Sequence, residues 1–155
     1  MNRLLHFVFG AALALFVSEK CGTEEIADTN SLRVVVVPTT THVRVGEHFT
    51  LKLRVENSTT TNQYVRVMSC SWPEQWKSSS PSIVGPDIFC TFNAPISETV
   101  PAGGAIKFDL EVSVPVPILI EPITSKLSFQ MGFTPVGSKK TLWSKEVAIN
   151  VSPDT

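Results

Sequence analysis

The sequence predicts an all-β domain made of two antiparallel sheets packed face to face. Three observations lead to this prediction. Hydrophobic and polar residues alternate over several short stretches, as they do in strands with one buried face. The 11 prolines and 8 glycines gather mainly between those stretches, where they favour turns. Charged residues make up only 17% of the 155-residue chain, and no helical periodicity follows the N-terminal segment.

The clearest strand covers residues 49–56, in which every second residue is hydrophobic. Residues 32–37 form a nearly continuous hydrophobic run, which is typical of a strand covered on both faces or lying at an edge. Pro115, Pro117 and Pro122 cannot donate to a sheet, so we expect an edge or a crossing there. About seven or eight strands predict an immunoglobulin-like antiparallel β-sandwich, with a small closed barrel as the alternative. The other strand-like segments are residues 64–70, 88–92, 106–112, 127–131 and 147–151.

Residues 1–22 have the layout of a secretory signal peptide, with a short basic start, a hydrophobic stretch and a polar end. The hydrophobic stretch is shorter than the ~20 residues that span a bilayer. An uncleaved anchor or a helix of the domain is the alternative, and Cys21 is a candidate for lipid attachment. Residues 23–31 form a polar linker, and the sandwich covers residues 32–152. We therefore expect a secreted, periplasmic or cell-envelope protein, with membrane contact only through an uncleaved or lipidated N-terminal segment.

The cysteines fit an oxidising compartment. Cys70 and Cys90 each lie in or at the end of a strand-like segment, and exported thiols that meet in space form disulfides. A bridge closing a loop of this length would stabilise the fold by about 3 kcal/mol. The alternative is two independent buried thiols, and Cys21 is left over in either case.

Several functional classes are disfavoured by composition and motifs. With 13 basic and 14 acidic residues and a formal net charge of −1, the chain lacks the positive excess of a nucleic-acid-binding protein. His42 and His48 flank a turn and could approach Glu47, but this spacing is not diagnostic of a metal site. Cys70 could act as a nucleophile only beside a base. We therefore expect no catalytic residues, no metal and no cofactor.

The most unusual segment is residues 71–81, where Trp72 and Trp76 lie in a serine-rich stretch. Aromatic rings on a disulfide-anchored loop present a large hydrophobic area to a partner at low entropic cost. We predict that Trp72 and Trp76 bind the partner, together with the turn at Gly103 and Gly104. The alternative is that both rings cover the core, with Trp72 more buried than Trp76.

Two segments resemble strand entries of bacterial extracellular immunoglobulin-like domains. They are Val45-Gly46-Glu47 and Val100-Pro101-Ala102-Gly103-Gly104, each followed by an alternating strand. The resemblance covers residues 32–113 and implies the fold, and a function only by analogy. The antibody pattern is not met, because Trp72 follows Cys70 by two residues.

The chain also has a distant similarity to chagasin-type inhibitors of papain-like cysteine proteases, which insert three loops into an active-site cleft. The corresponding segments are residues 57–61, 102–104 and 134–136, in the family's order. Ser58 replaces the proline of the first motif, Pro101 stands at the first glycine of the second, and the third lacks its arginine and tryptophan. The resemblance implies protease inhibition as an alternative function.

The function that these observations favour is an exported, non-catalytic binding or structural module. Its loops, chiefly the one from Trp72 to Pro86, would contact a protein or glycan partner at the cell surface. Exposed sheet edges offer a second route, by strand addition.

Overall fold

The structure, a computed structural model, describes residues 31–115 and 125–153. The predicted signal peptide, Cys21 and most of the predicted linker lie outside the described residues, as do Pro117 and Pro122. Within the described ranges, no helix has the length and hydrophobicity needed to cross a membrane.

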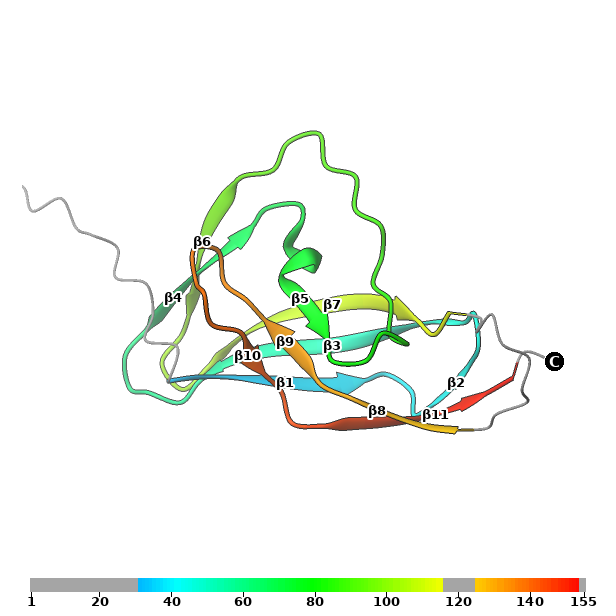
Figure 1. The fold of residues 1–155 in the computed structure, drawn as a ribbon. Coiled ribbons are helices and arrows are strands. Elements are labelled where there is room, and N and C mark those ends of the chain that lie inside the picture. Colours follow the sequence, from blue (N-terminus) through cyan, green and yellow to red (C-terminus); the bar gives the residue numbers. More distant parts are fainter. Residues whose placement is uncertain (1–30, 116–124, 154–155) are drawn as a thin grey trace, which may run out of the picture.

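The first sheet contains three antiparallel strands in the order β1-β3-β7 (Figure 1). Strand β3 (His48–Asn57) lies between β1 (Leu32–Pro38) and β7 (Ala105–Ser113). The hydrophobic residues of the alternation at 49–56 are at most 5% exposed, because this central strand turns every second side chain into the core. The hydrophobic run at 32–37 belongs to β1, which is an edge strand of this sheet because only β3 pairs with it.

The second layer joins two three-stranded groups, β10-β9-β5 and β2-β11-β8. They are continuous because only Gln130 separates β8 from β9, and three residues separate β10 from β11. The Gln130 side chain crosses this interruption and donates to the carbonyl of Ser144 at 2.9 Å. Strand β2 runs parallel to β11, and the remaining pairs are antiparallel. The bounds are β2 (His42–Arg44), β5 (Trp76–Ser78), β8 (Ser125–Phe129), β9 (Met131–Phe133), β10 (Leu142–Trp143) and β11 (Val147–Ser152).

A further antiparallel pair, β4 (Gln63–Met68) with β6 (Pro95–Val100), lies at one end of the molecule. A 3-10 turn, η1 (Trp72–Gln75), connects β4 to β5. Residues 79–94, which we call the tethered loop, lead from β5 to β6 and form the uppermost part of the molecule in Figure 1.

The prediction of an all-β sandwich is confirmed, whereas one predicted strand is wrong. Residues 88–92 lie outside any strand, in the tethered loop. The core takes buried hydrophobic residues from both layers and from the β4–β6 pair. Among the most deeply buried are Leu51, Leu53, Val55, Val65, Val100, Val112, Phe129, Phe133 and Ile149.

Candidate functional site

A disulfide joins Cys70, just after β4, to Cys90 in the tethered loop. The Cα atoms are 6.0 Å apart, within the range of protein disulfides. The predicted bridge is thus confirmed. Disulfides of this kind are typical of oxidising compartments such as the periplasm or the extracellular space.

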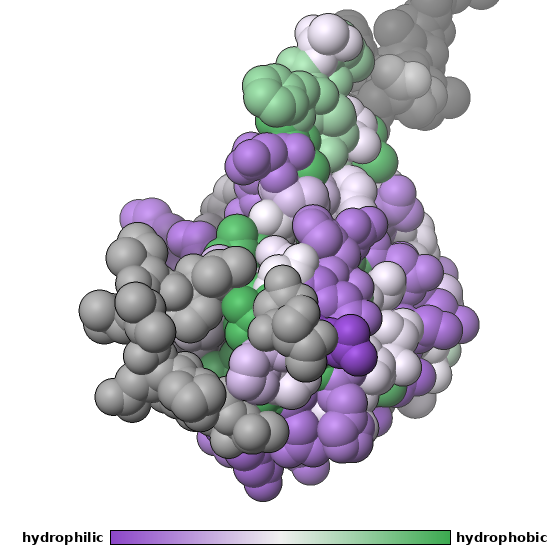
Figure 2. Space-filling model, turned by 90° about the vertical axis from the view of Figure 1, so that its right-hand side faces the viewer, coloured by the Kyte–Doolittle hydropathy of each residue, from purple (hydrophilic) through white to green (hydrophobic). Residues whose placement is uncertain are grey.

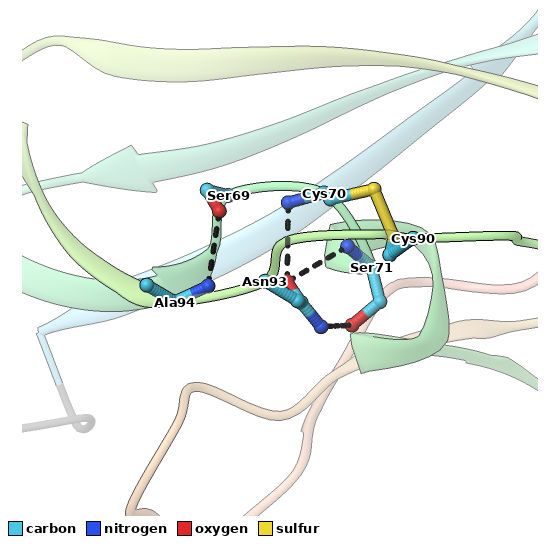
Figure 3. The surroundings of a disulfide bond; sticks show 6 residues. All are labelled: Ser69, Cys70, Ser71, Cys90, Asn93 and Ala94. Carbon is cyan, nitrogen blue, oxygen red and sulfur yellow. Dashed lines mark hydrogen bonds between the residues drawn. A yellow bond between two sulfur atoms is a disulfide. The ribbon is translucent and has the colours of Figure 1, made fainter.

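Asn93 forms a second connection beside the disulfide (Figure 3). Its Oδ1 accepts hydrogen bonds from the backbone N–H groups of Cys70 and Ser71, both at 3.2 Å, and its Nδ2 donates to Ser71 Oγ at 2.6 Å. The next residue, Ala94, pairs with Ser69 through two further hydrogen bonds. The C-terminal part of the tethered loop is therefore held against the turn at Cys70 by covalent and polar contacts.

Two phenylalanines on either side of Cys90 project into solvent. Phe89 is 96% exposed and Phe92 is 79% exposed. In Figure 2 the tethered loop forms a lobe at the top of the molecule, and the visible surface of the lobe is mostly hydrophobic. A contiguous exposed hydrophobic patch on a protein surface often marks a contact site for a partner. These two side chains are the strongest candidate contact residues in the described part of the chain.

The tethered loop leaves the sheet because of a proline. Val84 begins to pair with Ser113 of β7, and the two residues exchange both backbone hydrogen bonds at 3.0 and 2.9 Å. Continued antiparallel pairing would place Pro86 opposite Glu111, where a backbone N–H is required. Proline has none, so the pairing stops after one bridge and the chain turns away from β7.

The two predicted binding tryptophans lie against the core. Trp76 is 6% exposed, and its ring centroid is 4.9 Å from that of Phe133 and 5.7 Å from that of Phe108. Trp72 is partly buried and packs on Phe108 at 5.1 Å. The burial of Trp76 supports the alternative that this ring covers the core, and its predicted role in partner binding stays a prediction. The structure also reverses the expected order, since Trp76 is the more buried ring.

Gln75 explains why this segment stays close to the sandwich. Its side chain is buried and replaces strand pairing between β4 and the residues after β9. Its Oε1 accepts from the N–H of Met68 at 2.8 Å, and its Nε2 donates to the carbonyls of Arg66 and Thr134. These bonds hold η1 and the start of β5 against the core.

The turn at Gly103 and Gly104 has a structural explanation. Gly103 has a positive φ of 63°, which glycine adopts without strain. A Cβ atom on Gly104 would lie 3.1 Å from Pro101 Cβ, so larger residues would crowd the turn. The backbone thus favours glycine at Gly103, and a side chain at Gly104 would need Pro101 to shift; the predicted role of both in binding stays a prediction.

Asn57, the first residue of the chagasin-like segment 57–61, organises two loops. It is 2% exposed, and its Nδ2 donates to the carbonyls of Thr61, Val100 and Pro101. Its Oδ1 accepts from the backbone N–H and the hydroxyl of Thr59. The loop after β3 and the turn after β6 are consequently fixed to each other.

The histidines do not converge. His42 lies near Asn150 and Thr41, whereas His48 contacts Glu111 at 3.0 Å on the first sheet. Glu47 accepts a hydrogen bond from the N–H of Arg44 in the turn between them. Across residues 31–115 and 125–153, no group of three His, Cys, Asp or Glu side chains is placed to bind a metal ion.

No family model matches this sequence, and no curated protein is similar to it. The solved structures that are similar in part include two with 12% sequence identity each. The sporulation control protein Spo0M from Bacillus subtilis matches 81% of this chain with a TM-score of 0.44, and this chain spans 50% of its length. The cohesin module of a family 33 glycoside hydrolase from Clostridium perfringens matches 80%, with a TM-score of 0.32 and 98% of that module covered. Neither similarity is strong enough to inform function.

Sequence patterns gave little indication of the contact residues. Phe89 and Phe92 lie in a short hydrophobic stretch that reads as a strand. The available signal was its position between Pro86 and Pro95, since prolines on both sides disfavour a central strand.

Proposed function

We propose that this protein is an exported, non-catalytic binding module that contacts a protein or glycan partner through the tethered loop. The observation that carries the proposal is the near-complete exposure of Phe89 and Phe92 on a segment fixed by the disulfide and by Asn93. A pre-fixed loop loses less conformational entropy on binding than a free one. Aromatic side chains are among the residues that most often dominate binding energy.

The surroundings of the two rings favour a hydrophobic contact. Between Ile88 and Ser97 the sequence has no charged residue, and Ile96, which follows the loop at the start of β6, is 41% exposed. Its exposure extends the hydrophobic surface beyond the loop itself. Export is part of the proposal, and the disulfide supports it because the cytoplasm keeps most thiols reduced.

The test is affinity capture on the immobilised, oxidised protein from its native envelope or medium. The double variant Phe89→Ser with Phe92→Ser should lose at least about tenfold in partner retention, whereas Thr91→Ser on the same loop should retain it fully. Both variants should unfold at the wild-type temperature, because neither changes a buried residue. Equal capture by the double variant and the wild type would exclude the loop as the contact site.

Inhibition of a papain-type protease is the second candidate. The observation in its favour is that the first two loops compared with chagasin lie together, since the N–H of Gly103 donates to the carbonyl of Thr59 at 3.0 Å. The third segment is bonded elsewhere, from Thr134 to Gln75 and from Val136 to Arg66. Titration of papain with the purified protein tests this candidate, and full protease activity at micromolar protein would remove it.

A further inference from the structure

We propose that the free edge of β7 is a second binding site, which adds one extended peptide strand and takes a hydrophobic side chain of that peptide into the cleft beside it. This site is separate from the exposed phenylalanines and does not depend on their role. Strand addition of this kind obtains affinity from backbone hydrogen bonds and specificity from pockets for alternate side chains.

The first argument is the direction of the backbone groups of β7. The N–H of Asn57 donates to the carbonyl of Gly104, just before β7. Because hydrogen-bonded pairs recur at every second residue of the β3–β7 register, the even-numbered residues of β7 bond to β3. Backbone groups in a strand alternate sides, and the odd-numbered residues must point the other way. Ser113 confirms this, because it bonds to Val84 on the outer side.

The edge is consequently open over several residues. The N–H and carbonyl groups of Lys107, Asp109 and Glu111 face away from β3, and no described residue pairs with them there. A strand edge with unpaired groups is a template for another chain. The bridge at Val84 shows that this edge accepts an antiparallel neighbour, and Pro86 stops the protein's own chain from continuing it.

The second argument is a cleft beside this edge, between β7 and β5. It has a volume of about 220 Å³. Its lining combines hydrophobic side chains with the polar side chains of Glu74 and Ser78. Trp76, Leu110, Val112 and Met131 form its buried side, and the exposed Gly85 and Pro86 of the tethered loop form its mouth.

Register connects the edge to the cleft. In an antiparallel strand that continues from the Val84 bridge, the residues opposite Asp109 and Glu111 would exchange backbone hydrogen bonds with β7. The residue between them would lie opposite Leu110 and share its face of the sheet. Leu110 is 3% exposed and lines the cleft, so that peptide side chain would enter the cleft.

The chemistry of the peptide follows from these contacts. It is extended, has no proline at the two residues that bond to β7, and carries an aliphatic residue between them. The side chains of Asp109 and Glu111 are exposed on the outer face, so basic residues at the two flanking positions are favoured. A probe with these features is an acetylated and amidated pentapeptide of sequence Lys-Leu-Lys-Thr-Thr, whose residues would lie opposite Glu111 to Lys107 and stop short of Ser113, which pairs with Val84.

Amide hydrogen exchange on the full oxidised protein measures this directly. With saturating peptide, the amides of Lys107, Asp109 and Glu111 should exchange at least about tenfold more slowly. A peptide with aspartate in place of leucine, and one with prolines in place of both lysines, should leave exchange unchanged. Unchanged exchange with the leucine peptide, or equal protection by the proline peptide, would overturn the proposal.

Two variants at one position test whether the peptide binds at the cleft. A Cβ on Gly85 meets no atom within 4 Å, and its φ is not positive, so both Gly85→Ala and Gly85→Phe should fold. Gly85→Phe should weaken the peptide at least about tenfold by filling the mouth, whereas Gly85→Ala should bind as the wild type does. Equal binding by both would place the peptide elsewhere and overturn the proposal.

The double variant Phe89→Ser with Phe92→Ser should bind the peptide normally, which separates this site from the exposed phenylalanines. If protection of the three β7 amides instead rises with protein concentration in the absence of peptide, the occupant is a second copy of the chain. That result would also overturn the proposal of a peptide site.

Discussion

The two aromatic pairs joined to the disulfide differ in environment. Trp72 and Trp76 follow Cys70 and pack on the core, whereas Phe89 and Phe92 flank Cys90 and project into solvent. Both pairs lie in short, turn-rich stretches of sequence. The difference arises from the backbone: β5 pairs with β9 and directs Trp76 inward, while Pro86 turns the tethered loop away from β7. Aromatic content alone therefore does not identify a contact surface.

The largest effect is expected at the buried member of this comparison. Trp76→Ala should lower the free energy of unfolding by about 3–5 kcal/mol, because it empties a large volume between Phe108 and Phe133. Chemical denaturation followed by circular dichroism measures the change. Phe89→Ala is the matched control and should change stability by less than about 0.5 kcal/mol. Similar losses in the two variants would contradict the assignment of Trp76 to the core.

Removing the disulfide should have the next largest effect. The double variant Cys70→Ser with Cys90→Ser should lose about 3 kcal/mol of stability. Without the disulfide, the ends of the loop between two cysteines 20 residues apart are no longer held together in the unfolded chain. Unfolding of the wild type in the presence of a reductant should show a similar loss. A reductant that also destabilises the double variant would indicate that the effect has another source.

Asn57→Ala should destabilise the protein by about 1–3 kcal/mol, because three carbonyl groups lose a donor in a buried position. The exchange of amides in residues 58–61 and 101–104 should accelerate together, since Asn57 connects the two loops. Ser58→Ala is the control on the neighbouring exposed residue. If only one loop responds, Asn57 does not couple them.

The smallest effect on stability is expected from Pro86→Thr. This substitution restores a backbone N–H opposite Glu111, so the bridge at Val84 can extend by one pair. We expect slower amide exchange at Glu111 than in the wild type and a protected new amide at position 86, with a change in stability of less than about 1 kcal/mol. Unchanged exchange at Glu111 and an unprotected amide at position 86 would show that another feature directs the loop away from β7.

Much of the fold could be read from the sequence. The alternation at residues 49–56 predicts a strand with one buried face, and that strand is the centre of the first sheet. The partial exposure of residues 88–92 could not be read in this way, because a short hydrophobic stretch is compatible with both a strand and an exposed loop. Their environment depends on Pro86 and on Cys90, whose effects require the position of β7 and of Cys70.

The candidate contact residues were harder to predict than the fold. The disulfide was predicted from the expected export and from two cysteines in strand-like segments. The roles of Trp76 and Phe89 did not follow, since the sequence shows that both are large and hydrophobic but not which side of the backbone faces the core. Asn57 was equally hidden, because three of its hydrogen-bond acceptors lie 4, 43 and 44 residues along the chain.

By itself, the sequence determined the periodicity of the strands and the positions of the turns, and it made Cys70 and Cys90 the candidates for a disulfide. These features depend on local chemistry: side-chain alternation, proline and glycine geometry, and thiol reactivity. Only the tertiary structure decided that Trp76 is covered, that Phe89 and Phe92 are exposed and that one edge of β7 is open. Burial and edge pairing depend on which distant segments lie alongside each other, and that information is not contained in any single stretch of sequence.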